Sequence, residues 1–589
     1  MRPPIGIGNT LIALAVSEPR LFEHMEDRPL DMALFSRPLQ SRRAIGVFRS
    51  YCFALLTAVA SLGITAHWTL GAITWTGDVD PSDPNTWTDE TYAYIGRTVD
   101  GTLMVDGDSD LRSYTGLVGY DRASTGAVVV AGAGSTWTNG RTLSVGNFGK
   151  GTLAISDGGV VEVAGNTVVA YGPESSGEIH FDGGALSTGG LLAAAANLTG
   201  TGTIDLHGLV SDVDIAFDAS HGLRQSIILN ELPGQNITLN LGVDGSGAMG
   251  AGYGGVGTMT VSDGIVVRST SGHIGNAAGS SGTVTVDGIG STWTNADDLY
   301  IGDTGSGSLG ITGGGTVSTS KNSFIGRNNG STGAVMVDGA GSTWNTASLL
   351  YIGLMDSNGT LSITNGGRVN STNSYIRNVT GATETVRVNG PGSTWTNSGE
   401  LLVGNYGRAT LVISDGGVVS VAGTLTVDAN SDGNAFINMA SDGMLALMGD
   451  ADDSLGEYLD LVQGTDAIRY WDNSLSAWAL LTSAAYGDDY TLEYLTAGDL
   501  AGYTLLTVLA PGPPGDFDVD GIVDGGDFLA WQRGASPDPH SPADLAAWQA
   551  HYGDDLSAAT AAAIPEPAAW VLAALGAMLL VRRRAGRHC

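Results

Sequence analysis

The stretch Gly151-Thr-Leu-Ala-Ile-Ser-Asp-Gly-Gly159 sets the architecture, because it returns almost unchanged as Gly359-Thr-Leu-Ser-Ile-Thr-Asn-Gly-Gly367 and as Ala409-Thr-Leu-Val-Ile-Ser-Asp-Gly-Gly417. In each stretch two apolar residues stand two positions apart, which places both side chains on one face of a β-strand. The Asp/Asn-Gly-Gly that follows predicts a tight corner, since glycine readily adopts a positive φ. Each copy is therefore expected to be one strand that ends in a turn.

This pattern recurs along most of the chain. The apolar pairs are Leu103/Val105, Val128/Val130, Leu153/Ile155, Ile179/Phe181, Met259/Val261, Val284/Val286, Leu309/Ile311, Val335/Val337, Leu361/Ile363, Val386/Val388, Leu411/Ile413 and, more weakly, Ala435/Ile437. Neighbouring pairs lie 24 to 26 residues apart, except across one break between Phe181 and Met259. Such a return is typical of a three-sided parallel β-helix, whose coils stack and bury an inward row. We predict an all-β, right-handed parallel β-helix (a solenoid) over residues 73–430, with an irregular insertion at about 182–258.

A second short strand that ends in glycine precedes most of these pairs, so each coil is expected to contain more than one strand. Examples are Tyr94-Ile95-Gly96, Tyr300-Ile301-Gly302, Phe324-Ile325-Gly326 and Tyr351-Ile352-Gly353.

Alternate coils also carry Gly-Ser-Thr-Trp, which ends at Trp137, Trp293, Trp344 and Trp395. The last three tryptophans are 51 residues apart, so the repeating unit is a pair of coils. This row of four tryptophans has two interpretations. Exposed aromatic rings can stack on sugar rings, which makes these four residues candidates for sugar contact. One large ring per double coil can instead fill a widened corner of the core, and this structural interpretation is the favoured one.

Residues 431–510 lose the repeat and gain Leu, Tyr and Trp. A stack of coils leaves an open edge that would promote aggregation, so a β-rich cap is expected here. The segment 511–515, Pro-Gly-Pro-Pro-Gly, is typical of a linker.

Residues 516–527 form a candidate calcium loop. Acidic residues stand at loop positions 1, 3, 5, 9 and 12, with glycine at position 6 and an apolar residue at position 8. Calcium prefers six to eight oxygen ligands, and alternate side chains of a tightly turning loop converge on one point. The expected ligands are Asp516, Asp518, Asp520, the backbone carbonyl of Ile522, Asp524 through a water, and Asp527.

The composition excludes several classes of function. The 26 Lys and Arg stand against 60 Asp and Glu, for a formal charge of −34. Such a chain repels nucleic acid and anionic lipid and favours divalent cations, so no nucleic-acid partner is expected. The two cysteines, Cys52 and Cys589, lie in the terminal segments, which excludes a disulfide scaffold.

Both ends of the chain predict export. Arg42, Arg43 and Arg49 precede an apolar stretch over 51–66 that ends in small residues, so residues 1–72 are expected to be a leader with a signal peptide. Near the other end, Pro565-Glu566-Pro567 is followed by an apolar run over 568–581 and by Arg582, Arg583 and Arg584. A run of this length spans a bilayer poorly, so the tail is expected to anchor the chain in the membrane only transiently.

These segments carry three resemblances. Residues 565–589 resemble the PEP-CTERM sorting signal of bacterial surface proteins, which implies processing by an exosortase-type enzyme, with the tail in the inner membrane until then. The double coil resembles the T5SS/PEP-CTERM-associated repeat. Residues 516–556 resemble a dockerin type I module with one intact loop and a degraded second one, which implies calcium binding and a cohesin-like partner. We therefore expect a small α-helical EF-hand-like module after the cap.

The leading hypothesis is a secreted cell-surface or extracellular-matrix protein with a structural or adhesive role, in contact with polysaccharide or with partner surface proteins. The alternative is a polysaccharide lyase or hydrolase tethered by the dockerin-like module, because parallel β-helices also host such enzymes. No catalytic residues can be assigned from the sequence. An autotransporter passenger is less favoured, since no run of membrane β-strands follows the repeats.

Overall fold

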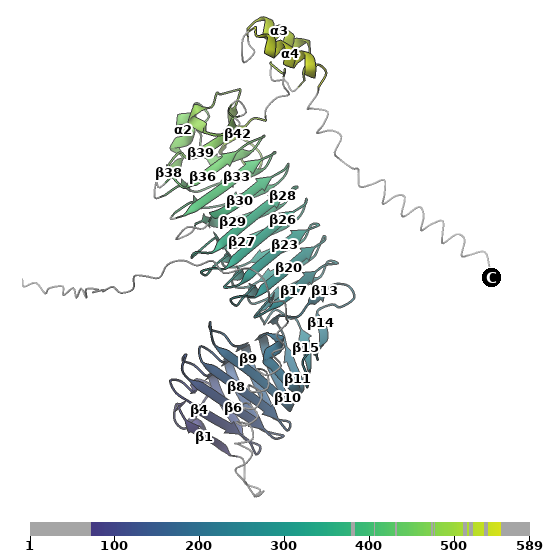
Figure 1. The fold of residues 1–589 in the computed structure, drawn as a ribbon, viewed down its shortest axis with the longest axis vertical. Helices are drawn as coiled ribbons and strands as arrows, with labels where there is room; N and C mark the ends of the chain where they lie inside the picture. The colour runs from purple at the N-terminus through teal and green to yellow at the C-terminus, as the bar shows by residue number, and fades with distance from the viewer. Residues whose placement is uncertain are drawn as a thin grey trace, which may run out of the picture. The chain divides into compact units, whose positions relative to one another are not determined.

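The computed structural model describes residues 72–377, 383–405, 407–429, 433–472, 475, 477–510, 515–517, 522–534 and 540–554. Almost all of the described chain up to residue 508 is β-strand or turn (Figure 1). The expected signal peptide and sorting tail lie outside the described residues, as do 511–514 of the expected linker. Within the described part of the chain, no helix has the length and apolar character needed to cross a membrane.

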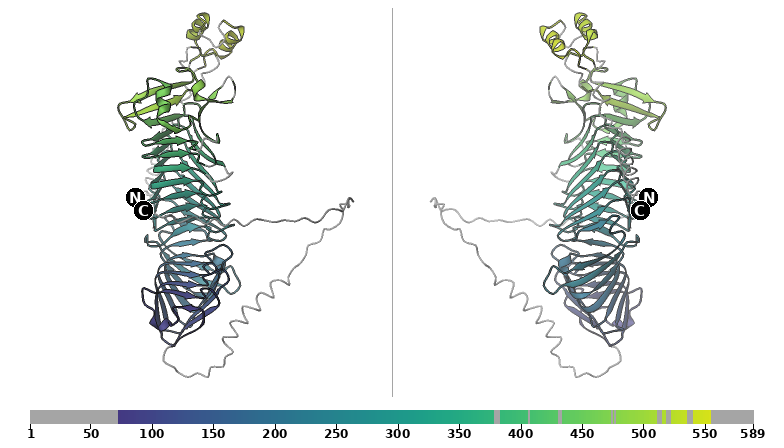
Figure 2. Two further views of the ribbon diagram at one scale, coloured as in Figure 1. Left: turned by 90° about the vertical axis from the view of Figure 1, so that its left-hand side faces the viewer. Right: turned by 90° about the vertical axis from the view of Figure 1, so that its right-hand side faces the viewer.

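Each regular coil has three sides. One coil consists of β20 (Ser281–Asp287), β21 (Thr292–Asn295) and β22 (Leu299–Ile301), and the next of β23 (Ser306–Thr312), β24 (Thr316–Thr319) and β25 (Ser323–Ile325). All three strand pairs are parallel and in register. We call the three sides the first, second and third faces in this order. The predicted parallel β-helix is confirmed, and both side views in Figure 2 show the strands stacked coil upon coil.

The third face is one parallel ladder through the whole solenoid. Its strands are β3 (Tyr92–Ile95), β5 (Asp110–Val118), β7 (Thr136–Val145), β9 (Val160–Val169), β10 (Ser176–Leu192), β12 (Leu209–Ser211), β16 (Met249–Ala251), β19 (Gly272–Ile274), β22, β25, β27 (Thr343–Ile352), β29 (Arg368–Ile376), β32 (Leu401–Val403), β35 (Leu425–Val427) and β38 (Val462–Gly464).

The other two faces are interrupted at the insertion. Before it, the first face is built from β4 (Gly101–Val105), β6 (Thr125–Ala131), β8 (Lys150–Ser156), β10 and β11 (Leu198–Leu206). The second face runs from β5 through β7, β9, β10 and β11 to β15 (Asn236–Gly242), whose Leu239 is in register with Ile204 and, through it, with Leu186. After it, the first face consists of β13 (Ile215–Phe217), β17 (Val256–Val261), β20, β23, β26 (Thr332–Asp338), β28 (Asn358–Thr364), β30 (Thr383–Asn389), β33 (Arg408–Ser414), β36 (Ala435–Met439) and β39 (Ile468–Asp472). The second face resumes with β18 (Val266–Ser269), β21, β24, β27, β29, β31 (Thr394–Asn397), β34 (Val418–Val421) and β37 (Met444–Met448).

The insertion therefore consists of irregular coils rather than a separate domain. Its strands β10, β12 and β16 continue the third face into β19, while β14 (Arg224–Leu229) pairs antiparallel with β15 and ends the ladder below the break. We call the coils before this break the N-terminal coils and those after it the C-terminal coils. Among the described strands, the third-face ladder is the one that joins the two sets across the break.

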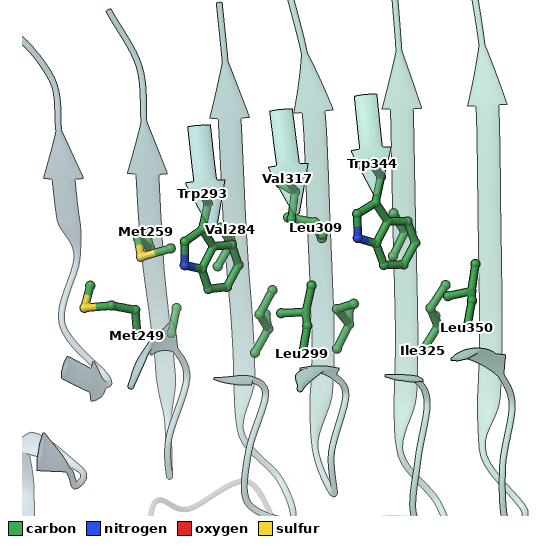
Figure 3. Close-up of a cluster of buried hydrophobic side chains, with 14 of the residues drawn as sticks. Met249, Met259, Val284, Trp293, Leu299, Leu309, Val317, Ile325, Trp344 and Leu350 are labelled. Carbon is green, nitrogen blue, oxygen red and sulfur yellow. The ribbon is translucent and has the colours of Figure 1, made fainter. Parts of the chain in front are cut away.

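The core explains why the unit is a pair of coils. Along the second face the inward side chains alternate between an aliphatic residue and tryptophan, as Figure 3 shows for Trp293, Val317 and Trp344. Those from Val267 to Val419 are fully buried. In register they are Val267, Trp293, Val317, Trp344, Val369, Trp395 and Val419. On the third face Gly272, Ser323 and Ser374 alternate with leucines in register. A small residue in the preceding coil leaves room for the indole. Burial of each indole is worth up to about 5 kcal/mol from its area alone.

The two ends of the solenoid are closed by antiparallel strands. At the start, β1 (Ile73–Gly77) pairs with β4 and β2 (Val79–Asp80) with β3. At the other end, β40 (Ala477–Leu480) pairs with β39, and β42 (Tyr503–Val508) pairs with both β37 and β41 (Tyr490–Leu495). The short helix α2 (Leu455–Asp460) inserts before β38. Because β36, β38 and β39 remain parallel, the coils continue to about residue 472, beyond the expected boundary at 430.

Candidate binding surfaces and calcium loop

The tryptophans of the repeat lie in the core and not on the surface. Trp137, Trp293, Trp344 and Trp395 are each 0% exposed, so their interpretation as a sugar contact is wrong and the core-filling interpretation is confirmed. Because side chains of a strand alternate between its faces, an inward tryptophan cannot meet a ligand outside the coil.

The polar residues beside the tryptophans are also buried. Ser135 and Asn139 are 0% exposed. Each serine of Gly-Ser-Thr-Trp accepts a hydrogen bond from a backbone N–H of the preceding coil, at 3.0–3.1 Å. These serines are Ser135, Ser291, Ser342 and Ser393, and the donors are Asp108, Gly264, Gly314 and Gly366. The motif therefore ties neighbouring corners together.

Aromatic residues do reach the surface, on the outer side of the third face. Sequence reasoning missed them, although the signal was present in strands such as Tyr300-Ile301-Gly302. Ile301 is fully buried, so the alternation of a strand turns Tyr300 outward. Two rows result, one on each set of coils.

The C-terminal row is a ladder of stacked rings, formed by His273, Tyr300, Phe324, Tyr351 and Tyr375. Their centroids are 5.1–5.4 Å apart, and the angles between successive ring planes are 30°, 7°, 6° and 31°. The residues occupy equivalent positions in successive coils, so the strand register itself stacks them. Each inner ring therefore has its faces covered by its neighbours.

Charged groups flank the C-terminal row. The Arg327 guanidinium lies 4.8 Å from the Tyr300 ring centroid and pairs with Asp303 at 3.0 Å. Burial raises the pKa of the Tyr300 phenol, and the carboxylate of Asp298, which accepts its O–H at 3.0 Å, raises this pKa further. Burial also favours the neutral form of His273 and therefore lowers its pKa. The row is thus a packed, partly desolvated stripe.

The N-terminal row has a different geometry. Tyr94, Tyr120, Phe148 and Tyr171 meet edge to face, with centroids 5.1, 6.5 and 5.8 Å apart and interplanar angles of 86°, 84° and 78°. Tyr94 lies in β3, whereas the other three follow the ends of β5, β7 and β9, in turns that are tied to the preceding coil by backbone hydrogen bonds. Phe148 is 37% exposed and Tyr171 57%. This row leaves ring faces open to solvent.

The insertion holds a small cavity of about 200 Å³ lined by Asp205, Leu206, His207, Arg224, Asn240, Gly242, Val243 and Asp244. Nδ1 of His207 lies 2.9 Å from Oδ2 of Asp244, and Asn240 donates to Asp205 at 2.9 Å. The hydroxyl and backbone N–H of Ser246 bind Asp244 and lower the pKa of its carboxyl. The topology thus gathers titratable groups that the sequence leaves scattered.

The candidate calcium loop is described only in part, because residues 518–521, with Asp518 and Asp520, lie outside the described residues. Among the described residues no group of three or more His, Cys, Asp or Glu is arranged for a metal ion. Asp527 is fully buried, and its carboxylate accepts the backbone N–H of Phe517 at 2.5 Å and that of Asp524 at 2.7 Å. This carboxylate closes the loop by joining positions 2 and 9 to position 12.

Two helices complete the module around this loop. The helix α3 (Gly525–Gln532) begins at the Asp524 cap and α4 (Pro542–His551) at the Ser541 cap. Trp548 packs on Phe528 with centroids 4.8 Å apart and donates its indole N–H to the backbone oxygen of Asp524 at 2.6 Å. Val523, at loop position 8, is fully buried and exchanges backbone hydrogen bonds with Gly553 and Asp554. The all-oxygen donor set fits calcium better than a soft metal.

The remaining predicted site cannot be placed. Pro565, Glu566, Pro567, Arg582, Arg583 and Arg584 all lie outside the described residues. The sorting signal therefore remains a prediction.

Comparison with known proteins gives one partial likeness. A segment is 30% identical over 151 residues to "Adhesin BmaC autotransporter" of Brucella suis biovar 1 (strain 1330), which covers 24% of this chain and 4% of the adhesin. No family model and no solved structure matches.

Proposed function

We propose that the chain is an exported scaffold that holds an adhesive surface away from the cell and contacts extracellular polysaccharide or partner surface proteins. The observation that carries the proposal is the third-face ladder, which runs in parallel register from β3 to β38. Such a ladder makes a stiff platform, because every coil is hydrogen-bonded to its neighbours. The partial likeness to an autotransporter adhesin supports the same role.

We further propose that residues 516–527 bind Ca²⁺ and that the module built on this loop docks to a cohesin-like partner. Asp516, Asp518, Asp520, Asp524, Asp527 and the carbonyl of Ile522 would hold the ion. When bound, the ion supplies a hard positive charge that offsets the repulsion among five carboxylates. Support comes from the buried Asp527, which already holds both sides of the loop together.

Calcium should raise the melting temperature of the helical module in the full chain. Asp516→Ala with Asp520→Ala should abolish the rise, because the double variant removes two of the carboxylates at the start of the loop. Asp499→Ala, at an exposed position in the cap, is the control and should leave the rise intact. Differential scanning calorimetry with and without Ca²⁺ is the measurement. A parent protein that melts identically in both conditions would contradict the site.

The PEP-CTERM-like tail is proposed to direct exosortase-type processing at the inner membrane. Surface labelling of intact cells and mass spectrometry of the labelled protein test the export and the sorting together. We expect labelled protein whose C-terminus lies near Pro567. Protein confined to the cell interior would overturn the proposed function, and surface protein that retains Arg584 would overturn the sorting step alone.

One observation favours a second candidate, an enzyme that degrades polysaccharide. The cavity in the insertion places His207, held by Asp244, beside Asp205 and Arg224. A base held by a carboxylate is the arrangement that general acid–base catalysis needs. New chain ends after incubation with polysaccharides, lost in His207→Ala, would establish this candidate.

A further inference from the structure

The N-terminal row is an exposed aromatic surface without a covering element among the described residues. Besides Phe148 and Tyr171, Tyr92 is 49% exposed and pairs edge to face with Tyr114, at a centroid distance of 5.4 Å. Single exposed aromatics are common, but a contiguous row across several coils marks an interaction surface.

The ring geometry favours a ligand that packs on ring faces. In an edge-to-face row the faces of alternate rings point away from their neighbours, whereas in the C-terminal row the faces are buried in the stack. The negative face of an aromatic ring attracts the weakly positive C–H groups of a pyranose ring. Because neighbouring ring planes are nearly perpendicular, rings that present a face in the same direction recur on alternate coils, a spacing that suits every second sugar unit of an extended chain.

The charges around the row select a neutral ligand. Arg97 lies 4.7 Å from the Tyr94 centroid and is paired with Asp80, and Arg112 is paired with Asp89 at 3.7 Å. These paired charges offer hydrogen bonds to hydroxyl groups, and Arg141, 6.0 Å from the Tyr114 ring centroid, adds one further guanidinium to the surface. The formal charge of −34 over the chain repels an anionic polymer.

The far end of the row has a defined limit. Beyond Tyr171 the outer side of the third face is closed by a small apolar cluster of Leu192, Val210, Ala248 and Tyr253. The Tyr253 hydroxyl donates to the backbone oxygen of Ala170 at 3.4 Å, so its ring spans the junction and is itself buried. The open surface therefore extends from Tyr92 to Tyr171 and stops at the insertion.

We propose that the N-terminal row, with Tyr94, Tyr120, Phe148 and Tyr171 as its stacking platform, binds a neutral polysaccharide. The inference rests on the proposed adhesive function and names the surface and the ligand class for it. Phe148 and Tyr171 are the principal contacts, because they expose the most ring area in the row.

Affinity electrophoresis of the full chain tests the proposal, in gels that contain hydroxyethyl cellulose, xyloglucan or polygalacturonate. We expect retardation in at least one neutral gel and none in polygalacturonate. Phe148→Ala with Tyr171→Ala should weaken the retardation by about tenfold or more. Tyr171→Trp, which keeps a ring face, should retain it.

The matched control is Phe324→Ala with Tyr351→Ala, which removes two rings from the C-terminal row and should leave retardation unchanged. Unchanged retardation in the Phe148/Tyr171 variant, retardation in polygalacturonate alone, or no retardation of the parent in any gel would overturn the proposal. A dimer that dissociates in the Phe148/Tyr171 variant, measured by analytical ultracentrifugation, would assign the row to a second copy and overturn it as well. The surface-labelling result is independent of all these outcomes, so the failure of the row leaves the exported scaffold standing.

Discussion

The inward tryptophans and the outward aromatic rows lie on adjacent faces of the same solenoid, yet they have opposite surroundings. Trp344 is fully buried between Val317 and Val369, while Phe148 and Tyr171 are open to solvent. The C-terminal row lies between these extremes, since its rings cover one another. Before a row of aromatic residues in a repeat protein is assigned a ligand, it has to be established whether the side chains point into the core or out to solvent.

The largest expected loss of stability comes from a buried tryptophan. Trp344→Ala should destabilise the chain by about 3–5 kcal/mol, because it removes a large ring from a closed core and leaves a cavity. Chemical denaturation followed by circular dichroism is the measurement. Tyr171→Ala is the matched control, and a loss as large in the control would contradict the difference between the two regions.

A smaller effect is expected from the residue that makes room for an indole. A Cβ on Gly272 would lie 2.9 Å from Cη2 of Trp293 and 2.4 Å from Cδ1 of Leu299. Trp293, which has Gly272 in the preceding coil, donates its indole N–H to Ser269 at 3.1 Å. Trp344, which has Ser323 there, has no hydrogen-bond partner for this group within the described residues.

Gly272→Ser should therefore shift Trp293 toward the environment of Trp344 and cost about 1–3 kcal/mol through overpacking and the lost hydrogen bond. The thermal midpoint and the tryptophan fluorescence report the change. Ser308→Ala, at an exposed position on the outer side of β23, is the control. A neutral Gly272→Ser would refute the packing argument.

Removing one ring from the C-terminal row should destabilise the chain more than removing one from the N-terminal row, although both losses are smaller than those above. Phe324→Ala removes two stacked contacts and a partly buried ring, for a loss of about 1–2 kcal/mol. Phe148→Ala should cost less, about 0.5–1 kcal/mol, since its ring is 37% exposed and its two neighbours contact it edge to face at longer centroid distances of 6.5 and 5.8 Å. Equal losses in the two variants, measured by denaturant titration, would remove the distinction between stacked and open rows.

The smallest effect concerns pH. The pKa of Tyr300 is raised in the folded chain, so the neutral phenol contributes stability that is fully present below about pH 10 and is lost as pH rises toward the folded pKa. Tyr300→Phe cannot ionise and should flatten the fall of the melting temperature between about pH 10 and pH 11. Tyr92→Phe, at an exposed position, is the control. Parallel curves for Tyr300→Phe and the parent would contradict the linkage.

The coil, its strands and its corners could be predicted from the alternation of apolar residues and from the return every 24 to 26 residues, because each is set by local periodicity. The spacing of 51 residues between tryptophans likewise predicted the double unit. The calcium loop and the sorting tail follow from local motifs and remain predictions of the sequence.

Which aromatic residues face outward, and which of their rows stays open, depended on the tertiary structure. Tyr300 and Phe324 stack because parallel strand register places equivalent positions above one another, whereas Tyr120 and Phe148 lie in the turns past the strand ends, joined by a single backbone hydrogen bond of 3.1 Å. The cavity at His207 and Asp244 is likewise a product of topology, since its lining comes from the ends of β11, β14 and β15. Long-range contacts of this kind depend on how coils stack, which a repeat in the sequence predicts only where the repeat is unbroken.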